Sequence, residues 1–199
     1  MTTAILITPI AKSVPVMKDA IYVGVDAGCI KILEEKLPLA YAVGDFDSMD
    51  LKEIQSLSCS CDIHPVEKDE TDSELAIEWA QKQKVDSIVL WGSLAGRMDH
   101  TMANVRLLMY RYSNLILQDE TQKMMRLSKG VHFIRNEYRH CSFFAIESSN
   151  ISLSGFKYNV EKQNLNVQDI YAVSNCLLED VACVQVHEGS LLCILSNEK

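Results

Sequence analysis

The sequence predicts an α/β domain with a mostly parallel sheet, followed by an all-β domain. In the first part of the chain, short apolar runs alternate with segments of helical periodicity, which is typical of βα units around a parallel sheet. After about Asp119 the helical periodicity fades, and short β-type runs separated by turn-forming residues replace it. A length of 199 residues suits one large domain or two small ones, and the change of pattern favours two.

The first domain is predicted to cover residues 1–122. Its clearest helix follows Gly96, where an apolar stripe at helical spacing is expected to lie in the core. The stripe consists of Met98, Met102, Val105, Leu108, Met109 and Tyr112. Two further helices are expected at 29–36 and 73–84, and the candidate strands are 4–8, 20–25, 40–43, 62–64, 87–91 and 114–118. This order predicts a Rossmann-like, three-layer α/β domain.

The second domain is predicted to cover residues 123–199, with a boundary near 119–128 that no Pro or Gly run marks. Turn-forming residues are expected to separate its strands at Ser154-Gly155, at 164–166 and at Glu188-Gly189. The candidate strands are 131–135, 142–146, 151–153, 170–173, 182–186 and 191–195. Short strands at this spacing predict a β-sandwich or a partial barrel.

Composition narrows the class of protein. A formal net charge of −8 argues against nucleic acid or an anionic membrane as the main partner, because both need a basic surface. The N-terminus has no charged region before a long apolar run, and no later run approaches membrane-spanning length, so we expect a cytoplasmic protein. The seven cysteines are an odd number without zinc-site spacing, and we expect them to be reduced, buried and structural.

Polar segments of the first domain fall where strands should end, which is the edge of an α/β sheet at which ligands bind. The segment Asp26-Ala27-Gly28 brings a carboxylate and then a glycine at which the chain can turn. Taken alone, the segment is better explained as a capping Asp in a tight turn, because Asp is strongly favoured at such positions.

The segment Gly44-Asp45-Phe46-Asp47-Ser48 carries two carboxylates two residues apart after a buried strand. Such a pair is costly in an apolar setting unless a cation compensates it. Mg²⁺ commonly uses one or two carboxylates together with substrate phosphates, so this loop is a candidate metal site. The alternative is a solvated turn.

The segment from Lys68 to Glu74 opens a predicted helix. Thr71 and Glu74 fit a capping box, which is a purely structural interpretation. Asp69 and Asp72 would nevertheless lie close together near the first turn, giving a second carboxylate pair beside Lys68, a point charge suited to phosphate.

The segment from Gly92 to His100 follows another predicted strand. Its two glycines would let backbone N–H groups approach an anion at a helix N-terminus, and Arg97 adds a planar set of donors for phosphate. Arg97, His100 and Asn104 would share one face of the helix. A solvated helix face is the alternative interpretation.

Several common catalytic motifs are absent from the sequence. It contains no G-x-x-x-x-G-K-[ST] loop and no G-x-G-x-x-G fingerprint, so a Walker-type kinase or a Rossmann dehydrogenase is disfavoured. It also lacks a G-x-S-x-G elbow, which disfavours hydrolases with a serine nucleophile.

Together the polar segments resemble the thiamine pyrophosphokinase (thiamine diphosphokinase) family in order and separation. The motifs are Asp26-Ala27-Gly28, Gly44-Asp45-Phe46-Asp47-Ser48, Lys68-Asp69-x-Thr71-Asp72-x-Glu74-x-Ala76 and Gly92-x₃-Gly96-Arg97-x-Asp99-His100-x₃-Asn104. In the second domain, Val173-Ser174-Asn175 followed by Val186-x₂-Gly189 is similar to the C-terminal pattern of the family. The family usually has Gly where Ala27 stands, a small steric change that concerns the local backbone.

The resemblance implies transfer of diphosphate from ATP to the hydroxyl of thiamine, giving thiamine diphosphate and AMP, with Mg²⁺ as cofactor. It also implies a catalytic α/β domain, a β-sandwich domain that contributes to thiamine binding, and a homodimer. The candidate catalytic residues and Mg²⁺ ligands are Asp45, Asp47, Asp69 and Asp72. The candidate substrate-binding residues are Asp26, Gly28, Ser48, Lys68, Glu74, Arg97, Asp99, His100, Asn104, Ser174 and Asn175.

The chemistry of the residues agrees with this reaction. Attack of an alcohol on phosphorus needs charge neutralisation, positioning and a proton acceptor. Carboxylate-held Mg²⁺ and Arg97 would neutralise charge, and one of the four carboxylates could accept the proton. Two alternatives stay open: another Mg²⁺-dependent nucleotide pyrophosphohydrolase or pyrophosphotransferase, and a sensor that binds thiamine or nucleotide without turnover.

Overall fold

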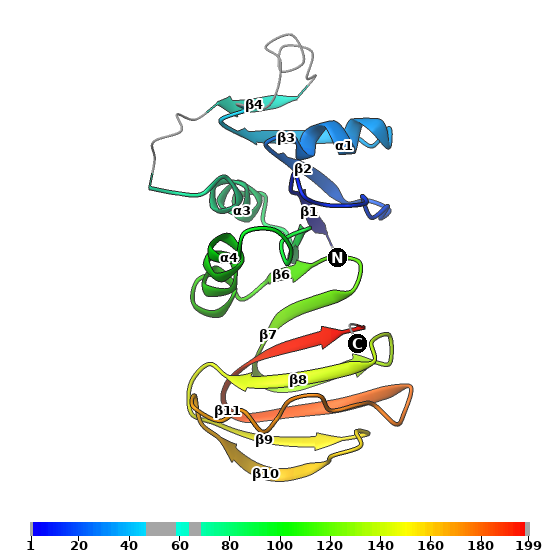
Figure 1. The fold of residues 1–199 in the computed structure, drawn as a ribbon, viewed down its shortest axis with the longest axis vertical. Helices are drawn as coiled ribbons and strands as arrows, with labels where there is room; N and C mark the ends of the chain where they lie inside the picture. Colours follow the sequence, from blue (N-terminus) through cyan, green and yellow to red (C-terminus); the bar gives the residue numbers. More distant parts are fainter. Residues whose placement is uncertain (1, 47–58, 64–68, 198–199) are drawn as a thin grey trace. The chain divides into compact units, whose positions relative to one another are not determined.

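The computed structural model describes residues 2–46, 59–63 and 69–197, which form a mixed α/β structure with few helices (Figure 1). The chain divides into two compact units. The first comprises Met1–Leu107 and Asn114–Glu120, and the second comprises Leu108–Ser113 and Thr121–Lys199. The strand pairs described in the first unit are parallel and those in the second are antiparallel, so the strands as a whole are of mixed type.

The sheet of the first unit has the strand order β4-β3-β2-β1-β5-β6. Its strands are β1 (Thr3–Ile7), β2 (Ile21–Val25), β3 (Leu39–Gly44), β4 (Ser60–Ile63), β5 (Ser87–Trp91) and β6 (Leu115–Gln118). From β1 to β4 the chain moves toward one edge, and β5 then returns to the other side of β1. The strand order therefore reverses between β1 and β5, and ligands of parallel α/β sheets bind at the carboxyl ends of the strands beside such a reversal.

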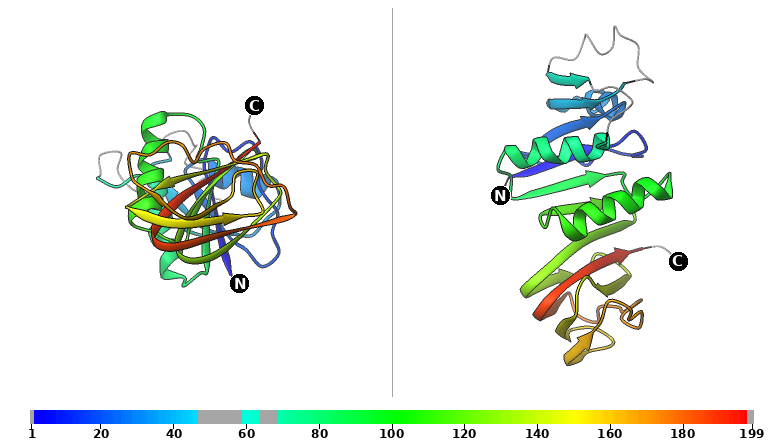
Figure 2. Two further views of the ribbon diagram at one scale, coloured as in Figure 1. Left: turned by 90° about the horizontal axis from the view of Figure 1, so that it is seen from below. Right: turned by 90° about the vertical axis from the view of Figure 1, so that its left-hand side faces the viewer.

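Helices α1 (Gly28–Glu34), α3 (Asp72–Lys82) and α4 (Met98–Tyr110) accompany this sheet. Figure 2 shows α3 and α4 in front of the strands and α1 behind them. Strand β1 is buried almost throughout, with Ala4, Ile5, Leu6 and Ile7 at most 1% exposed. Continuous apolar strands of this kind are typical of parallel sheets covered on both faces, which explains why the strands of the first unit could be predicted from short apolar runs.

Helix α3 begins where the capping motif predicts. The Oγ1 of Thr71 accepts a hydrogen bond from the backbone N–H of Glu74 at 3.1 Å, and Thr71 itself has an extended backbone. This bond satisfies one of the free N–H groups of the first turn. The predicted cap is confirmed, and it fixes Asp72 as the first residue of the helix.

The predicted core stripe on α4 is wrong for the first turns of the helix. Val105 and Leu108 are buried as expected, but Met98 is 73% exposed and Met102 is 52% exposed. Burial of α4 begins at Asn104, so the preceding turns are not packed in the core. Helical periodicity identifies the apolar face of a helix, but it does not tell where along the helix the covering layer stops.

The second unit is an antiparallel sheet centred on one long strand. Its strands are β7 (Gln122–Arg135), β8 (His140–Ala145), β9 (Ser149–Ser154), β10 (Val160–Leu165) and β11 (Val181–Ser196). Strand β11 pairs with β7 along its length on one side, and with β9 and then β8 on the other. Their inward side chains form one apolar core that includes Phe143, Val184 and Leu191.

Three predictions for the second unit are wrong. The runs 182–186 and 191–195 belong to the single strand β11, because Glu188-Gly189 forms an irregularity in the pairing and not a turn. This bulge shifts the inward positions from even to odd numbers, so both halves of β11 face the same core. The run 170–173 is not a strand, although Ile170 and Tyr171 are β-formers. Strand β10 was missed because it is polar and largely exposed.

All seven cysteines are free, as expected. Cys29, Cys141 and Cys193 are buried as expected, whereas the other four are half-buried, so the expectation of burial is wrong for them. Two of these four, Cys59 and Cys61, still pack against a core cluster. Among the residues that the structure describes, none of the helices has the length and apolar character that crossing a membrane requires.

Candidate active site

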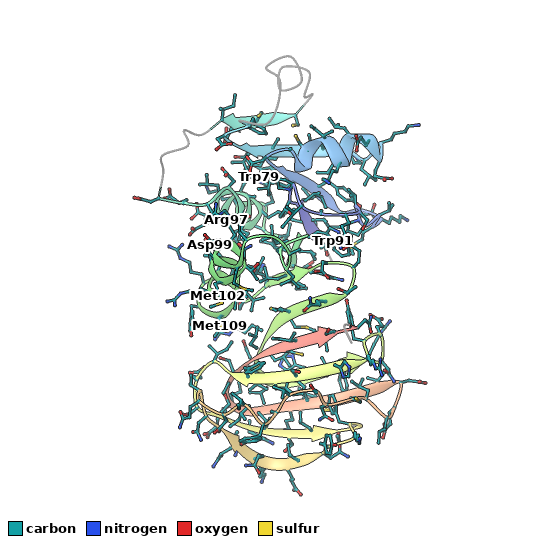
Figure 3. The ribbon with its side chains drawn as sticks, viewed as in Figure 1. Trp79, Trp91, Arg97, Asp99, Met102 and Met109 are labelled. Atoms are coloured by element: carbon teal, nitrogen blue, oxygen red, sulfur yellow. The ribbon has the colours of Figure 1, made fainter. Side chains whose placement is uncertain are left out.

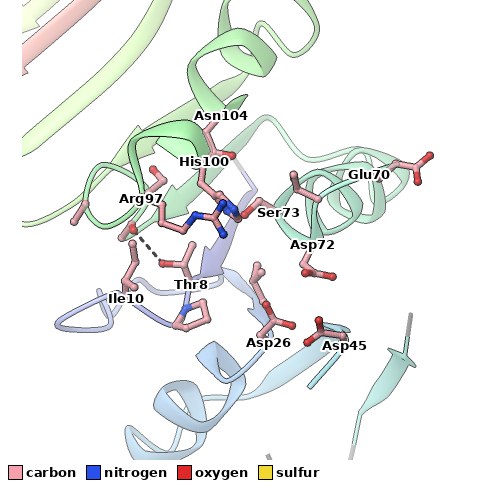
Figure 4. Close-up of a pocket in the computed structure, with 16 residues that line it drawn as sticks. Thr8, Ile10, Asp26, Asp45, Glu70, Asp72, Ser73, Arg97, His100 and Asn104 are labelled. Atoms are coloured by element: carbon pink, nitrogen blue, oxygen red, sulfur yellow. Dashed lines mark hydrogen bonds between the residues drawn. The ribbon is translucent and has the colours of Figure 1, made fainter. Parts of the chain in front are cut away.

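A cavity of about 380 Å³ opens in the first unit at the carboxyl ends of β1, β2, β3 and β5 (Figure 4). It lies beside the reversal of strand order, the position expected for a ligand site in a parallel α/β sheet. The lining residues are Thr8, Pro9, Ile10, Val25, Asp26, Asp45, Glu70, Thr71, Asp72, Ser73, Gly92, Ser93, Ala95, Arg97, His100 and Asn104. We call this cavity the polar pocket.

Three carboxylates enter the polar pocket from three different elements. Asp26 follows β2, Asp45 follows β3, and Asp72 is the first residue of α3. Figure 4 shows their side chains facing one region of the pocket. Asp26 takes part in this grouping, whereas Asp69, expected beside Asp72, does not line the pocket. Asp47 lies outside the described residues, so the expected pair Asp45/Asp47 stays a prediction.

Burial raises the pKa of the Asp26 carboxyl to about 6, and the negative charges of Asp72 and Asp45 add to the rise. Backbone N–H groups of Phe46 and Asp45 act in the opposite direction. The Oδ1 atom of Asp26 is buried and has no hydrogen-bond partner among the described residues. Asp26 is therefore a carboxylate whose charge is poorly compensated by the protein around it.

The backbone around Asp26 is also specialised. Asp26 has a φ of 47°, in the left-handed region that Asp tolerates better than most residues. The missing side chain of Gly44 makes room for the carboxylate, since a Cβ at this position would overlap Oδ1 of Asp26. Glycine at this end of β3 thus allows the ends of β2 and β3 to lie close together.

The residues fit a divalent cation by charge and by chemistry. A cation beside Asp26, Asp45 and Asp72 would offset the burial and the like charges that raise the pKa of Asp26, and it would give the Oδ1 atom of Asp26 a partner. As placed, no three His, Cys, Asp or Glu side chains within the described part of the chain lie close enough to hold a metal ion. Mg²⁺ usually completes its coordination with water and substrate phosphates, so a partial set of protein ligands is compatible with it.

Cationic and amide side chains line another side of the polar pocket. Arg97, His100 and Asn104 come from one face of α4 and the turn before it, as their spacing predicts (Figure 4). Arg97 forms a bidentate ion pair with Asp99, with 3.1 Å between Nε and Oδ1 and 2.6 Å between Nη2 and Oδ2 (Figure 3). Hydrogen bonds from Arg97 lower the pKa of Asp99, which does not line the pocket.

Thr8 and Ser93 line the polar pocket at the reversal of strand order, although neither was among the candidate residues predicted from the sequence. Thr8 Oγ1 donates to the carbonyl of Gly92 at 3.1 Å, and Ser93 Oγ donates to the carbonyl of Leu90 at 2.8 Å. Gly92 has a φ of 79°, and a Cβ there would lie 2.6 Å from the Cα of Ala11. Thr8 is the last residue of the predicted strand 4–8 and Ser93 is the second residue after the predicted strand 87–91, so a hydroxyl residue at each of these strand ends was the signal that could have identified them.

The other candidate residues of the first domain do not line the polar pocket or cannot be placed. Glu74 lies in the first turn of α3, and its backbone N–H binds the Thr71 cap. Gly28 is buried, and a Cβ there would overlap the carbonyl oxygen of Ile7, so its small size serves the packing of α1 on β1. Asp47, Ser48 and Lys68 lie outside the described residues.

Ser174 and Asn175 lie in the second unit. The Asn175 carboxamide is buried and makes three hydrogen bonds: it accepts from the N–H of Tyr158 and of Cys176 and donates to the carbonyl of Tyr158. Ser174 has an exposed side chain and a φ of 57°, and its N–H donates to Ser142 Oγ. Asn175 therefore orders the loop on which Ser174 is exposed.

Comparison with known proteins places these observations in one family. Residues 16–118 match the family model of the thiamin pyrophosphokinase catalytic domain, and residues 129–191 match that of the thiamin pyrophosphokinase vitamin B1 binding domain. The chain is 28% identical over 191 residues to the thiamine pyrophosphokinase of Bacillus subtilis, covering 91% of this chain and 89% of that protein.

Solved structures agree. The crystal structure of thiamine pyrophosphokinase from Bacillus subtilis superposes with a TM-score of 0.86 at 25% identity, covering 100% of both chains. That of thiamin pyrophosphokinase from Geobacillus thermodenitrificans gives 0.85 at 26% identity, covering 100% of this chain and 99% of the other. The resemblance inferred from the sequence motifs is confirmed, and the chain belongs to the thiamin pyrophosphokinase family of transferases.

Proposed function

We propose that the protein transfers diphosphate from ATP to the hydroxyl of thiamine, forming thiamine diphosphate and AMP, in a reaction that depends on Mg²⁺. The observation that carries the proposal is the arrangement of the polar pocket. Carboxylates of Asp26, Asp45 and Asp72 face one region of it, while Arg97 and His100 line another. Such a pocket can hold a metal-bound polyphosphate and also offer a proton acceptor to an attacking alcohol.

The residues take distinct roles in this proposal. When bound, Mg²⁺ supplies charge neutralisation on the phosphate oxygens, and Asp45, Asp72 and Asp26 are the described residues that would hold it, with Asp47 as a further candidate. Arg97 binds phosphate oxygens through its planar guanidinium, and Asp99 keeps that guanidinium in place. One carboxylate of the group accepts the proton of the attacking hydroxyl.

The second unit extends the proposal to thiamine and to assembly. Ser174 is exposed on a loop that Asn175 orders, so Ser174 is the candidate contact to thiamine and Asn175 its support. We further propose a homodimer in the cytoplasm, a Rossmann-like three-layer catalytic domain over residues 1–122, and a β-sandwich domain over 123–199.

The test is product analysis with purified protein, ATP and Mg²⁺, with and without thiamine. We expect AMP and thiamine diphosphate in equal amounts, and AMP only when thiamine is present. AMP formed without thiamine would identify a nucleotide pyrophosphohydrolase. Saturable thiamine binding without any product would identify a sensor.

A matched pair of variants ties the activity to the polar pocket. Asp45→Asn removes one pocket carboxylate at almost constant volume, whereas Asp19→Asn makes the same change at an exposed position of the same unit. Activity should be lost in Asp45→Asn and kept in Asp19→Asn. Equal activity in both variants would contradict the assignment of the site.

A further inference from the structure

Two segments of the first unit, the loop 8–11 and the turn 92–96, both contribute residues to the polar pocket. They follow β1 and β5, which are parallel and paired, so both segments leave the sheet at the reversal of strand order. The turn leads directly to Arg97, which binds phosphate in the proposed function. The conformation of the turn therefore sets the position of Arg97 and of the backbone N–H groups that precede it.

A threonine side chain joins the two segments. Thr8 Oγ1 donates a hydrogen bond to the carbonyl of Gly92 at 3.1 Å, drawn as the dashed line in Figure 4. Thr8 is 6% exposed, and its backbone N–H donates to the carbonyl of Trp91 at 3.2 Å. The hydroxyl thus extends the connection between β1 and β5 by one residue, into the turn. Because threonine is branched at Cβ, its hydroxyl has few orientations, and the Gly92 carbonyl is closely fixed.

Gly92 permits this close approach. Its φ of 79° lies in the left-handed region, and a Cβ there would lie 2.7 Å from Thr8 Oγ1 and 2.6 Å from the Cα of Ala11. The N–H of Gly92 donates to the carbonyl of Gln118 on β6 at 2.8 Å. The peptide group before Gly92 is therefore held by β6, and the peptide group after it is held by Thr8.

The rest of the turn 92–96 is held less firmly. Gly96 has a φ of 84°, and the atom nearest to a Cβ there would be Cδ1 of the half-exposed Ile10, at 2.9 Å. Within the part of the chain that the structure describes, the N–H groups of Ser93, Leu94 and Ala95 form no hydrogen bond. The shape of the turn therefore depends on its anchor at Gly92, and its N–H groups are available to an anion.

We propose that Thr8 is a positioning residue, whose hydroxyl holds the turn 92–96 in the conformation that binds the phosphates of ATP. It acts through Gly92 and not on the reacting atoms. The inference rests on the proposed function, which assigns the polar pocket to ATP. A hydrogen bond that orders the donors before the ligand arrives lowers the cost of binding. Loss of the hydroxyl should therefore weaken ATP binding and leave thiamine binding unchanged.

The experiment compares Thr8→Val with Thr3→Val in the full chain. Thr3 lies at the other end of β1, and its hydroxyl forms a hydrogen bond with Ser87 Oγ on β5 at 2.9 Å. Both variants thus remove one hydroxyl bond from the same pair of chain segments. Calorimetry with Mg²⁺ and a non-hydrolysable ATP analogue measures binding without turnover, and steady-state kinetics give KM for each substrate.

We expect Thr8→Val to weaken binding of the analogue and to raise KM for ATP about three- to tenfold, with KM for thiamine unchanged. Thr3→Val should keep the natural values of all three. A purely structural role of Thr8 would lower the melting temperature of both variants and leave the ATP affinity of both unchanged, and this result would overturn the inference.

Two further variants test the hydroxyl itself. Thr8→Ser keeps the donor and should restore most of the ATP affinity. Thr8→Ala removes the hydroxyl without placing a methyl group against the Gly92 carbonyl, and it replaces Thr8→Val if that variant does not fold. Natural affinity for the analogue in a folded variant without the hydroxyl would overturn the role of Thr8 and leave the proposed reaction intact.

The same measurements separate this inference from the proposed function. If the natural protein binds the analogue but forms no AMP that depends on thiamine, the proposed reaction is wrong, and calorimetry still decides the role of Thr8. If the natural protein does not bind the analogue, both proposals are wrong.

Discussion

The polar pocket of the first unit and the loop 171–175 of the second unit differ in what their polar groups do. In the polar pocket, Asp26 keeps a buried oxygen without a hydrogen-bond partner among the described residues, and burial with like charges raises its pKa to about 6. In the loop, the buried amide of Asn175 has both its oxygen and its nitrogen in hydrogen bonds to backbone.

This difference separates a group held for a ligand from a group that holds the fold. A buried polar atom without a partner costs stability, so it persists where a ligand will satisfy it. A buried amide with its hydrogen bonds made costs little and fixes a loop. The contrast predicts opposite effects of mutation in the two regions, on activity in the first and on stability in the second.

The largest effect is expected on activity. Asp45→Asn removes a charge at the polar pocket, and we expect kcat to fall about a hundredfold or more because charge stabilisation of the transition state is lost. The measurement is thiamine-dependent AMP formation at saturating substrates. The melting temperature should stay within a few degrees of that of the natural protein. A large loss of stability with little loss of kcat would contradict the assignment of Asp45 to a ligand site and not to the stability of the fold.

The next effect is expected on stability in the second unit. Asn175→Ala leaves the N–H groups of Tyr158 and Cys176 without their acceptor, and we expect the free energy of unfolding to fall by about 2–3 kcal/mol. Chemical denaturation measures it, and Asn136→Ala, at an exposed position of the same unit, is the control. If both variants lose the same stability, the amide does not hold the loop.

The outline of the first unit could be predicted from the sequence because four of its strands, β1, β2, β3 and β5, each have a run of four buried residues. Ile5 and Leu6 lie in such a strand, and unbroken apolar runs report it directly. Strand β10 gave no signal of this kind, since an exposed edge strand can be polar along its length. Met98 and Met102 were predicted to be buried but are exposed, because periodicity alone does not show where the packed layer ends.

The residue types of the candidate site could be predicted from the sequence, but which carboxylates lie next to each other in the fold could not. Spacing along the chain predicted pairs within a single segment, such as Asp69 with Asp72, but Asp69 does not line the pocket. The described grouping of Asp26 with Asp45 follows from the pairing of β2 with β3, which brings two strand ends together, and Gly44 permits the close approach. Strand order is a long-range property, so a single sequence does not reveal which carboxylates become neighbours.

A smaller effect on stability is expected at Asp26, where the substitution should stabilise the protein. Asp26→Asn removes a carboxyl whose pKa is about 6 in the folded protein and 3.8 ordinarily. Because the folded pKa is raised, the stability that this carboxyl contributes is present below about pH 4 and is lost as the pH rises to about 6. Above pH 6 we expect the variant to be more stable than the natural protein by about 1 kcal/mol, after allowing for solvent near a half-buried group.

Denaturation between pH 4 and pH 8 measures this difference, which should grow with pH and then level off. Asp19→Asn is the control, because Asp19 is exposed and also has a left-handed backbone, with a φ of 60°. Mg²⁺ should raise the melting temperature of the natural protein at pH 7.5 more than that of Asp26→Asn. A pH-independent difference would mean that the charge of Asp26 is not the cause.

The smallest effect is expected at Asp99, beside the polar pocket but not lining it. Asp99→Asn weakens the ion pair that orients Arg97, in which both side chains are largely exposed, at 64% and 72% respectively. Because an ion pair exposed to solvent contributes little, we expect KM for ATP to rise by about fivefold or less, with kcat nearly unchanged and stability unaffected. Raising the salt concentration should shrink the difference, because screening weakens the pair in the natural protein. A fall in kcat as large as that of Asp45→Asn would instead place Asp99 among the groups that contact the reacting atoms, and the polar pocket would extend beyond its described lining.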